Sequence, residues 1–108
     1  MEKEWIEKHI DDMVQDICKL SEIPSVSVKT EDPDIAFGQA CLDALHAALD
    51  LGKSMGFETF NHENYCGTLL WKGESDTEIG FFGHADVVPA GNGWTCCEPF
   101  KPVVKDGL

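Results

Sequence analysis

Arginine is absent from this 108-residue sequence, and all eight of its basic residues are lysines. Acidic residues number 20, so the formal net charge is -12 at pH 7. Nucleic acids and anionic membrane surfaces are bound through clusters of basic side chains, and this chain has no such cluster. We therefore expect no nucleic-acid partner and no membrane partner.

Long apolar runs are missing as well. A helix that crosses a bilayer needs about 18 or more consecutive apolar residues, and no stretch of this chain approaches that length. The first residues, MEKEWIEKHIDD, are charged and lack the apolar core of a secretion signal. On these grounds we expect a cytoplasmic protein.

The cysteines do not form a recognisable framework. Their number is odd and their spacing irregular, with no CxxC pair. In a chain without an export signal we expect them to be reduced thiols. They are Cys18, Cys41, Cys66, Cys96 and Cys97.

Two helices are expected in the first half of the chain. Apolar residues recur at spacings of three and four from Glu2 to Leu20, which is typical of an amphipathic helix. Trp5 and Met13 lie on this apolar stripe and are expected to pack in a core. A similar stripe from Phe37 to Met55 predicts a second helix, which Gly56 would end.

Strands are expected after the second helix, because the apolar period shortens. Phe57–Phe60 and Gly67–Trp71 are interpreted as two strands joined by a turn at His62–Asn64. The apolar run Ile79–Phe82 is interpreted as a strand buried on both faces. The order of helices and then strands predicts an α/β fold.

The last residues predict a further strand and a turn. Pro102–Lys105 is typical of a strand, and Asp106-Gly107 is a strong hairpin signal, yet only Leu108 follows. We therefore interpret residues 1–108 as the N-terminal piece of a longer polypeptide. Unpaired strand edges in such a piece predict self-association, as a homo-oligomer or through rearranged pairing.

The segment Gly80–Trp94, GFFGHADVVPAGNGW, carries the candidate chemistry. His84 and Asp86 follow an apolar run, and residues two apart in an extended chain project to the same side. In open α/β sheets, ligands bind beyond the carboxyl ends of the strands. An imidazole there can bind Zn²⁺ while a carboxylate orients it. A solvated hydrogen-bonded pair without a metal is the alternative.

The remaining histidines offer weaker candidates. His9 and His46 fall on the expected helices as surface or boundary residues, and His62 falls in the expected turn, without the second histidine of an HExxH site. Another alternative is a thiol nucleophile that uses His84 as its base. The cysteines considered for it are Cys66, Cys96 and Cys97.

The motif GHADVVPAGNGW, followed by EPFKPVVKDG, resembles the first metal motif of a family of zinc-dependent metallopeptidases. This family includes Xaa-His dipeptidases (carnosinase-like), glutamate carboxypeptidase, acetylornithine deacetylase, succinyl-diaminopimelate desuccinylase and aminoacylase. The upstream stretches IPSVSV, FGQACLDAL and GFETFNHENYCGTLLW resemble the bacterial dipeptidase branch. The likeness therefore covers nearly the whole chain.

The resemblance assigns roles to residues of this chain. It implies that His84 is a zinc ligand and that Asp86 is the catalytic acidic residue that orients this ligand. It also implies the N-terminal, incomplete part of a mixed-sheet, zinc-exopeptidase-like catalytic domain. The rest of that domain and a smaller dimerisation domain would lie outside residues 1–108. Ala85 and Asn92 depart from the family pattern without changing a ligand.

For the complete protein, the resemblance implies a dipeptidase that hydrolyses the amide bond of a small peptide substrate by metal-activated water. Two zinc ions per active site are implied, with at most one ligand from this chain. An amidohydrolase acting on N-acylated amino acids and a non-catalytic truncated module are the alternatives. The isolated 108-residue chain is expected to be inactive, because one histidine cannot assemble a two-metal site.

Overall fold

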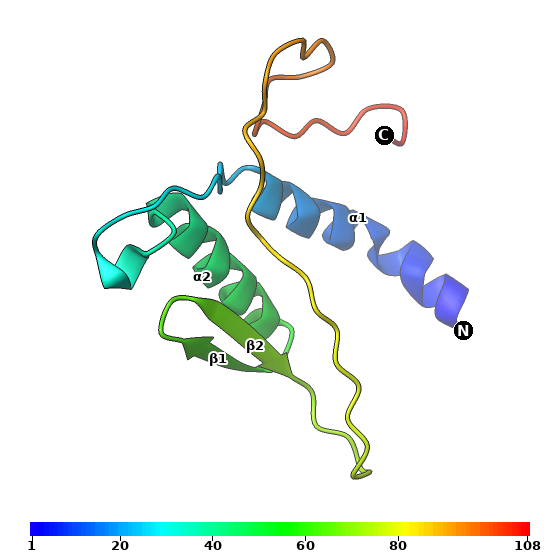
Figure 1. Cartoon of the computed structure of the whole chain (residues 1–108). Coiled ribbons are helices and arrows are strands. Elements are labelled where there is room, and N and C mark those ends of the chain that lie inside the picture. Colours follow the sequence, from blue (N-terminus) through cyan, green and yellow to red (C-terminus); the bar gives the residue numbers. More distant parts are fainter. The chain divides into compact units, whose positions relative to one another are not determined.

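The structure is a computed structural model that describes all 108 residues. It contains two α-helices, one short 3-10 helix and one two-stranded sheet (Figure 1). Helices followed by strands make a mixed α/β chain, as the sequence predicts. The contacts divide it into two units, Met1–Pro24 with Ala90–Leu108, and Ser25–Pro89.

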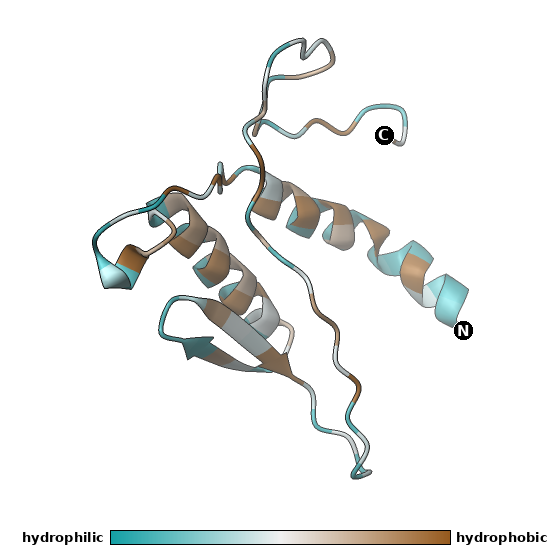
Figure 2. Cartoon of the chain, viewed as in Figure 1, coloured by the Kyte–Doolittle hydropathy of each residue, from teal (hydrophilic) through white to brown (hydrophobic).

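Helix α1, Glu2–Ser21, belongs to the first unit and matches the expected helix to within one residue. Acidic residues in its first turn and Lys19 in its last turn complement the helix dipole. Its apolar residues form bands along the helix in Figure 2, yet none of its residues is buried. The prediction that Trp5 and Met13 pack in a core is therefore wrong for this chain, because an apolar stripe does not specify which element covers it.

The C-terminal turn of the first unit forms, but the strand before it does not. Asp106 and Gly107 have φ angles of 53° and 77°, the positive values that a type I′ hairpin turn requires at both central positions. Lys105 and Leu108 exchange two backbone hydrogen bonds of 2.9 and 3.0 Å across the turn. The predicted strand Pro102–Lys105 is absent, since no second strand lies beside it.

The second unit contains the 3-10 helix η1, Pro33–Ile35, and helix α2, Gln39–Ser54. The side chain of Asp32 caps η1 by accepting a hydrogen bond of 2.9 Å from the Asp34 amide. Helix α2 begins two residues later than expected, because Gly38 has a φ of 92° and lies outside the helical region.

Strands β1, Glu58–His62, and β2, Cys66–Leu70, pair in antiparallel register, with His62 opposite Cys66. Both predicted strands are confirmed, with ends shifted by one or two residues. Glu63 and Asn64 turn the chain with φ angles of 54° and 63°. The prediction that His62 lies in the turn is wrong, because His62 is the last residue of β1 and forms part of the ladder.

Helix α2 packs closely on the hairpin because a glycine lies on each side of the contact. A Cβ atom at Gly52 would lie 1.9 Å from Leu69 Cδ2, and one at Gly67 would lie 2.7 Å from Leu49 Cδ2. The buried apolar side chains, Ala44 and Leu49, both come from α2. The core of the second unit is therefore the face of α2 that covers β1 and β2.

The predicted buried strand at Ile79–Phe82 is wrong for this chain. The sheet consists of β1 and β2 only, and Figure 1 shows the chain after β2 as a long loop. Ile79 is 77% exposed and Phe82 is fully exposed. A strand buried on both faces needs neighbouring strands and covering helices, and no other segment of the chain supplies them here.

Across both helices, no stretch combines the length and apolar character that a membrane crossing requires.

Candidate metal-ligand site

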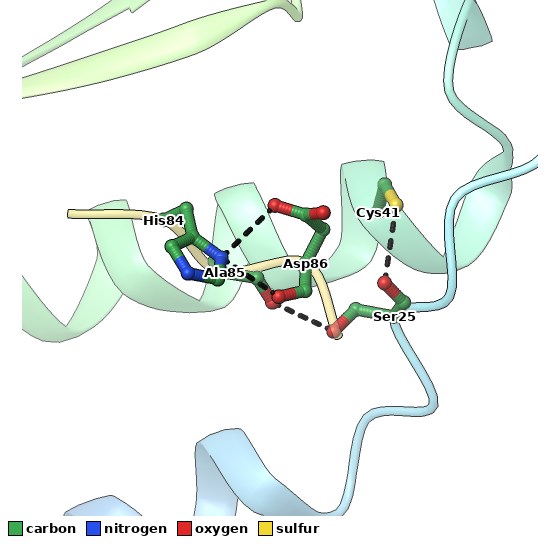
Figure 3. A network of polar contacts seen from close by, with 5 residues as sticks. All are labelled: Ser25, Cys41, His84, Ala85 and Asp86. Atoms are coloured by element: carbon green, nitrogen blue, oxygen red, sulfur yellow. Dashed lines mark hydrogen bonds and ion pairs between the residues drawn. The ribbon is translucent and has the colours of Figure 1, made fainter. Parts of the chain in front are cut away.

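His84 and Asp86 contact each other on the loop that follows the apolar run (Figure 3). The Nδ1 atom of His84 lies 3.2 Å from Asp86 Oδ1 and 2.9 Å from the backbone oxygen of Asp86. The two side chains lie together, as predicted for residues two apart in an extended segment. Both are open to solvent, with the His84 side chain 80% exposed.

The hydrogen bonds of His84 define the tautomer of its ring. A ring nitrogen that faces two oxygen acceptors must carry the hydrogen, so Nδ1 is the donor. The neutral ring then has its lone pair on Nε2, which has no hydrogen-bond partner in the structure. This is the arrangement in which a histidine binds a metal through one nitrogen while an oxygen orients it through the other.

The backbone around His84 is anchored by Ser25, a residue that is only 2% exposed. The Ser25 hydroxyl donates a hydrogen bond of 2.7 Å to the carbonyl of Ala85, and the Val87 amide donates one of 3.0 Å to the carbonyl of Ser25. Val26 and Val87 form an isolated parallel bridge beside these bonds. The candidate site is therefore tied to Ser25 and Val26, at the start of the second unit.

Cys41, from helix α2, completes this polar network (Figure 3). Its thiol donates a hydrogen bond of 3.3 Å to the carbonyl of Ser25. Burial raises the pKa of the Cys41 thiol above its usual value, and the negative charge of Asp86 raises it further. Both effects favour the neutral thiol, so Cys41 is a structural donor here rather than a nucleophile.

The thiol alternative gains no support from the cysteines considered for it. All five cysteines are free, and none of them has a hydrogen bond to His84. Cys96 and Cys97 contact each other with their sulfur atoms 3.6 Å apart, and the hydrogen bond between them raises the pKa of the Cys97 thiol. Cys66 lies in β2, opposite His62.

Two of the other histidines, His9 and His62, have local partners. His9 stacks on Trp5 with ring centroids 4.2 Å apart, and its Nδ1 lies 2.7 Å from the Trp5 carbonyl oxygen. The Nε2 atom of His62 lies 2.9 Å from Thr68 Oγ1 across the hairpin. His46 is exposed on α2. The structure brings none of them to His84.

The donor atoms at His84 fit zinc in kind but not in number. Zinc binds imidazole nitrogen, and a structural or catalytic site takes three or four protein ligands. No group of three or more histidine, cysteine, aspartate or glutamate side chains in this chain could hold a metal ion. His84 therefore fits zinc only as one ligand of a site that needs further residues.

Sequence reasoning did not single out Ser25 or Cys41 as parts of the site. Ser25 follows the first expected helix and Cys41 lies within the second, and neither the spacing nor the composition of their neighbours indicates a partner. The contact between Ser25 and Ala85 joins residues 60 positions apart. Only the folded chain shows it.

Comparison with known proteins relates this mixed α/β chain to bacterial proteins named dipeptidases. No family model matches the chain. The chain is 37% identical over 98 residues to the protein named "Putative dipeptidase YtjP" of Bacillus subtilis. It is also 37% identical over 105 residues to the Beta-Ala-Xaa dipeptidase of Lactobacillus delbrueckii subsp. lactis. A protein of Staphylococcus epidermidis named "Putative dipeptidase" is 34% identical over 107 residues.

These matches confirm the resemblance to the bacterial dipeptidase branch. They cover 90%, 96% and 98% of this chain, so the similarity includes the α2 and hairpin region as well as the segment around His84. The chain spans about a fifth of the length of these curated relatives, 21% of the first and 22% of the other two.

Proposed function

We propose that this chain is the N-terminal portion of the catalytic domain of a zinc-dependent dipeptidase, a metallopeptidase that hydrolyses the amide bond of small peptides. The observation that carries the proposal is the free Nε2 of His84, whose ring is oriented by Asp86, in a chain similar to proteins named dipeptidases. The complete catalytic domain would have a zinc-exopeptidase-like mixed sheet. A smaller dimerisation domain would lie elsewhere in the protein.

The proposed roles follow from the hydrogen bonds of the pair. His84 would contribute Nε2 as one ligand, and Asp86 would hold Nδ1–H so that the ring keeps one orientation. The carboxylate also makes the imidazole a stronger base toward a metal. A zinc ion held there would supply Lewis-acid chemistry, polarising a substrate carbonyl and activating water for attack. Residues outside this chain would supply the other ligands of a two-zinc site.

The proposal includes a small peptide as substrate, a cytoplasmic location, and no nucleic-acid or membrane partner. The charge of -12 and the absence of arginine support the expectation of no nucleic-acid partner and no membrane partner. The exposed apolar side chains along Ile79–Phe82 support self-association of the 108-residue chain. Sedimentation of this chain should show dimers or larger species, and a monodisperse monomer would contradict that part of the proposal.

The test uses the full-length protein, assayed for dipeptide hydrolysis before and after removal of metal by a chelator. Hydrolysis should disappear with the metal and return with added zinc. His84→Ala should lower kcat/KM by about 100-fold or more, because loss of a ligand disrupts the metal site. His46→Ala is the matched control, since His46 is exposed on α2 and makes none of the hydrogen bonds of the network, and it should keep wild-type activity.

Two outcomes would redirect the proposal. Hydrolysis of N-acylated amino acids but not of dipeptides would favour the amidohydrolase alternative. Loss of activity with a thiol alkylator but not with a chelator would favour a cysteine nucleophile. Wild-type turnover and full zinc content in His84→Ala would contradict the assignment of His84.

A further inference from the structure

Ser25 bonds both peptide groups that flank the α-carbon of Asp86. The carbonyl of Ala85 belongs to the peptide group before Asp86, and it accepts the hydrogen bond of 2.7 Å from the Ser25 hydroxyl. The amide of Val87 belongs to the peptide group after Asp86, and it donates the bond of 3.0 Å to the Ser25 carbonyl. One buried residue thus restrains the two backbone dihedral angles of Asp86.

The second of these peptide groups also holds the ring of His84. Its carbonyl oxygen, Asp86 O, lies 2.9 Å from His84 Nδ1, closer than the Asp86 carboxylate at 3.2 Å. The N–H of that group faces Ser25 and its C=O faces the imidazole. Because a peptide group is planar, fixing its N–H at Ser25 also fixes the direction of the oxygen that orients His84.

We propose that Ser25 is a positioning residue for His84: its hydroxyl and carbonyl hold the Asp86 backbone so that the His84 ring presents Nε2 to a metal. The inference rests on the proposed function, because it gives a residue outside the motif a role in the same site. It predicts that the orientation of His84 exists before any metal binds.

Helix α2 provides the rigid support for this contact. The carbonyl of Ser25 accepts a second hydrogen bond from the Cys41 thiol, 3.3 Å away, and Cys41 lies in the first turn of α2. The network therefore runs from a packed helix through Ser25 to the loop that carries His84 and Asp86 (Figure 3). A loop tied to a rigid element can hold a ligand within the narrow range of geometry that a metal site requires.

Serine suits this position because it supplies a donor in a nearly closed environment. Ser25→Ala would remove the donor and leave the Ala85 carbonyl without its partner. Ser25→Thr keeps the hydroxyl and adds one methyl group. Ser54→Ala is a matched control in the same unit, because the Ser54 hydroxyl donates a bond of the same length, 2.7 Å, to the Leu51 carbonyl on the exposed side of α2.

The experiment compares these variants in the full-length protein with two readouts besides activity. Hydrogen exchange of the Val87 amide is measured in the metal-free protein, and zinc affinity is measured by competition with a chelator. For Ser25→Ala we expect Val87 to exchange at least about tenfold faster. We expect zinc affinity to fall by about 10- to 100-fold, the usual effect of losing a group that supports a ligand. Ser25→Thr should restore both, and Ser54→Ala should change neither.

Three results would overturn the inference. The first is Val87 exchange and zinc affinity in Ser25→Ala that match those of Ser54→Ala. The second is a Ser25→Thr variant that loses as much Val87 protection and zinc affinity as Ser25→Ala does. The third is loss of exchange protection throughout α2 and the hairpin in Ser25→Ala, which would make Ser25 a general structural residue. His84→Ala in the same series separates the two claims: if it binds zinc as the wild type does, the proposed function fails, while Val87 exchange still decides the role of Ser25.

Discussion

Helix α2 with its hairpin and the segment Ile79–Val87 belong to the same unit but are held together in different ways. In the first region, elements that follow one another along the chain pack together, as Leu49 of α2 does against Gly67 of β2. In the second, the apolar side chains at Ile79 and Phe82 are exposed, and the first backbone hydrogen bonds to another segment come at Ala85 and Val87. A local pattern is sufficient where the partner lies nearby in sequence, and it is insufficient where the partner is distant.

The largest expected difference between the two regions is in the effect of truncating an aliphatic side chain. Leu49 is 8% exposed, and Leu49→Ala should destabilise α2 and the hairpin by about 2–5 kcal/mol through lost packing and the cavity left behind. Hydrogen exchange of the β2 amides should accelerate by about 30-fold or more. Ile79→Ala, at an exposed position, should change the same amides by less than about threefold. Equal effects would contradict the comparison.

A smaller effect is expected at the close approach of α2 to β2. Gly52→Ala places a methyl group against Leu69 and should cost about 1–3 kcal/mol in overpacking, which is partly offset by about 1 kcal/mol of helix propensity. The measurement is hydrogen exchange of α2 amides. Combining it with Leu69→Ala should recover stability relative to the sum of the single variants. Gly73→Ala, with no atom within 4 Å of the new Cβ, is the neutral control.

The charge of Asp86 should be detectable at Cys41. The pKa of the Cys41 thiol is raised by burial and then by Asp86, so removing the charge in Asp86→Asn should lower that pKa. Alkylation of Cys41 at mildly alkaline pH should then be a few times faster, because the thiolate reacts. Cys66, which is exposed in β2, should keep its rate. An unchanged Cys41 rate would mean that Asp86 does not lie near this thiol.

The same shift has a consequence for stability. A thiol whose pKa is higher in the folded than in the unfolded chain resists ionisation only when folded. The free energy of unfolding is therefore independent of this thiol below its pKa in the unfolded chain. It falls as the pH rises from that pKa through the higher pKa of the folded chain. Cys41→Ser should remove this alkaline loss, which is measured as the dependence of α2 hydrogen exchange on pH after correction for intrinsic rates. Persistence of the loss would assign it to another group.

The smallest effect is expected at the surface of the hairpin. Lys72 pairs with Glu58 at 3.0 Å, but both side chains are more than half exposed. Lys72→Ala should cost less than about 1 kcal/mol, and the effect should vanish in high salt. Exchange of β1 amides at two salt concentrations tests this. A larger or salt-independent cost would mean that Lys72 contributes packing as well as charge.

Much of the second unit was predictable because its signals are local. The apolar stripe of α2 and the change of period after Gly56 indicate a helix and two strands, and the structure shifts their ends by only one or two residues. The contact between His84 and Asp86 was predictable for the same reason, since it follows from the geometry of an extended chain.

The failures share one physical cause. Ile79–Phe82 and the apolar face of α1 have patterns typical of buried elements, but burial depends on a covering partner that a pattern does not identify. Ser25 is the opposite case. It is buried and bonded to the candidate site, but nothing near it in the sequence indicates a contact with Ala85.

The most direct test of the central claim is nitrogen NMR of the His84 ring in the full-length protein, labelled at histidine and assigned by comparison with His84→Gln. In the metal-free protein, Nδ1 should carry the hydrogen and Nε2 should show the resonance of an unprotonated nitrogen. Added zinc should shift Nε2 strongly while Nδ1 keeps its hydrogen. Zinc-dependent dipeptide hydrolysis with unchanged His84 resonances would contradict the claim that His84 is a zinc ligand.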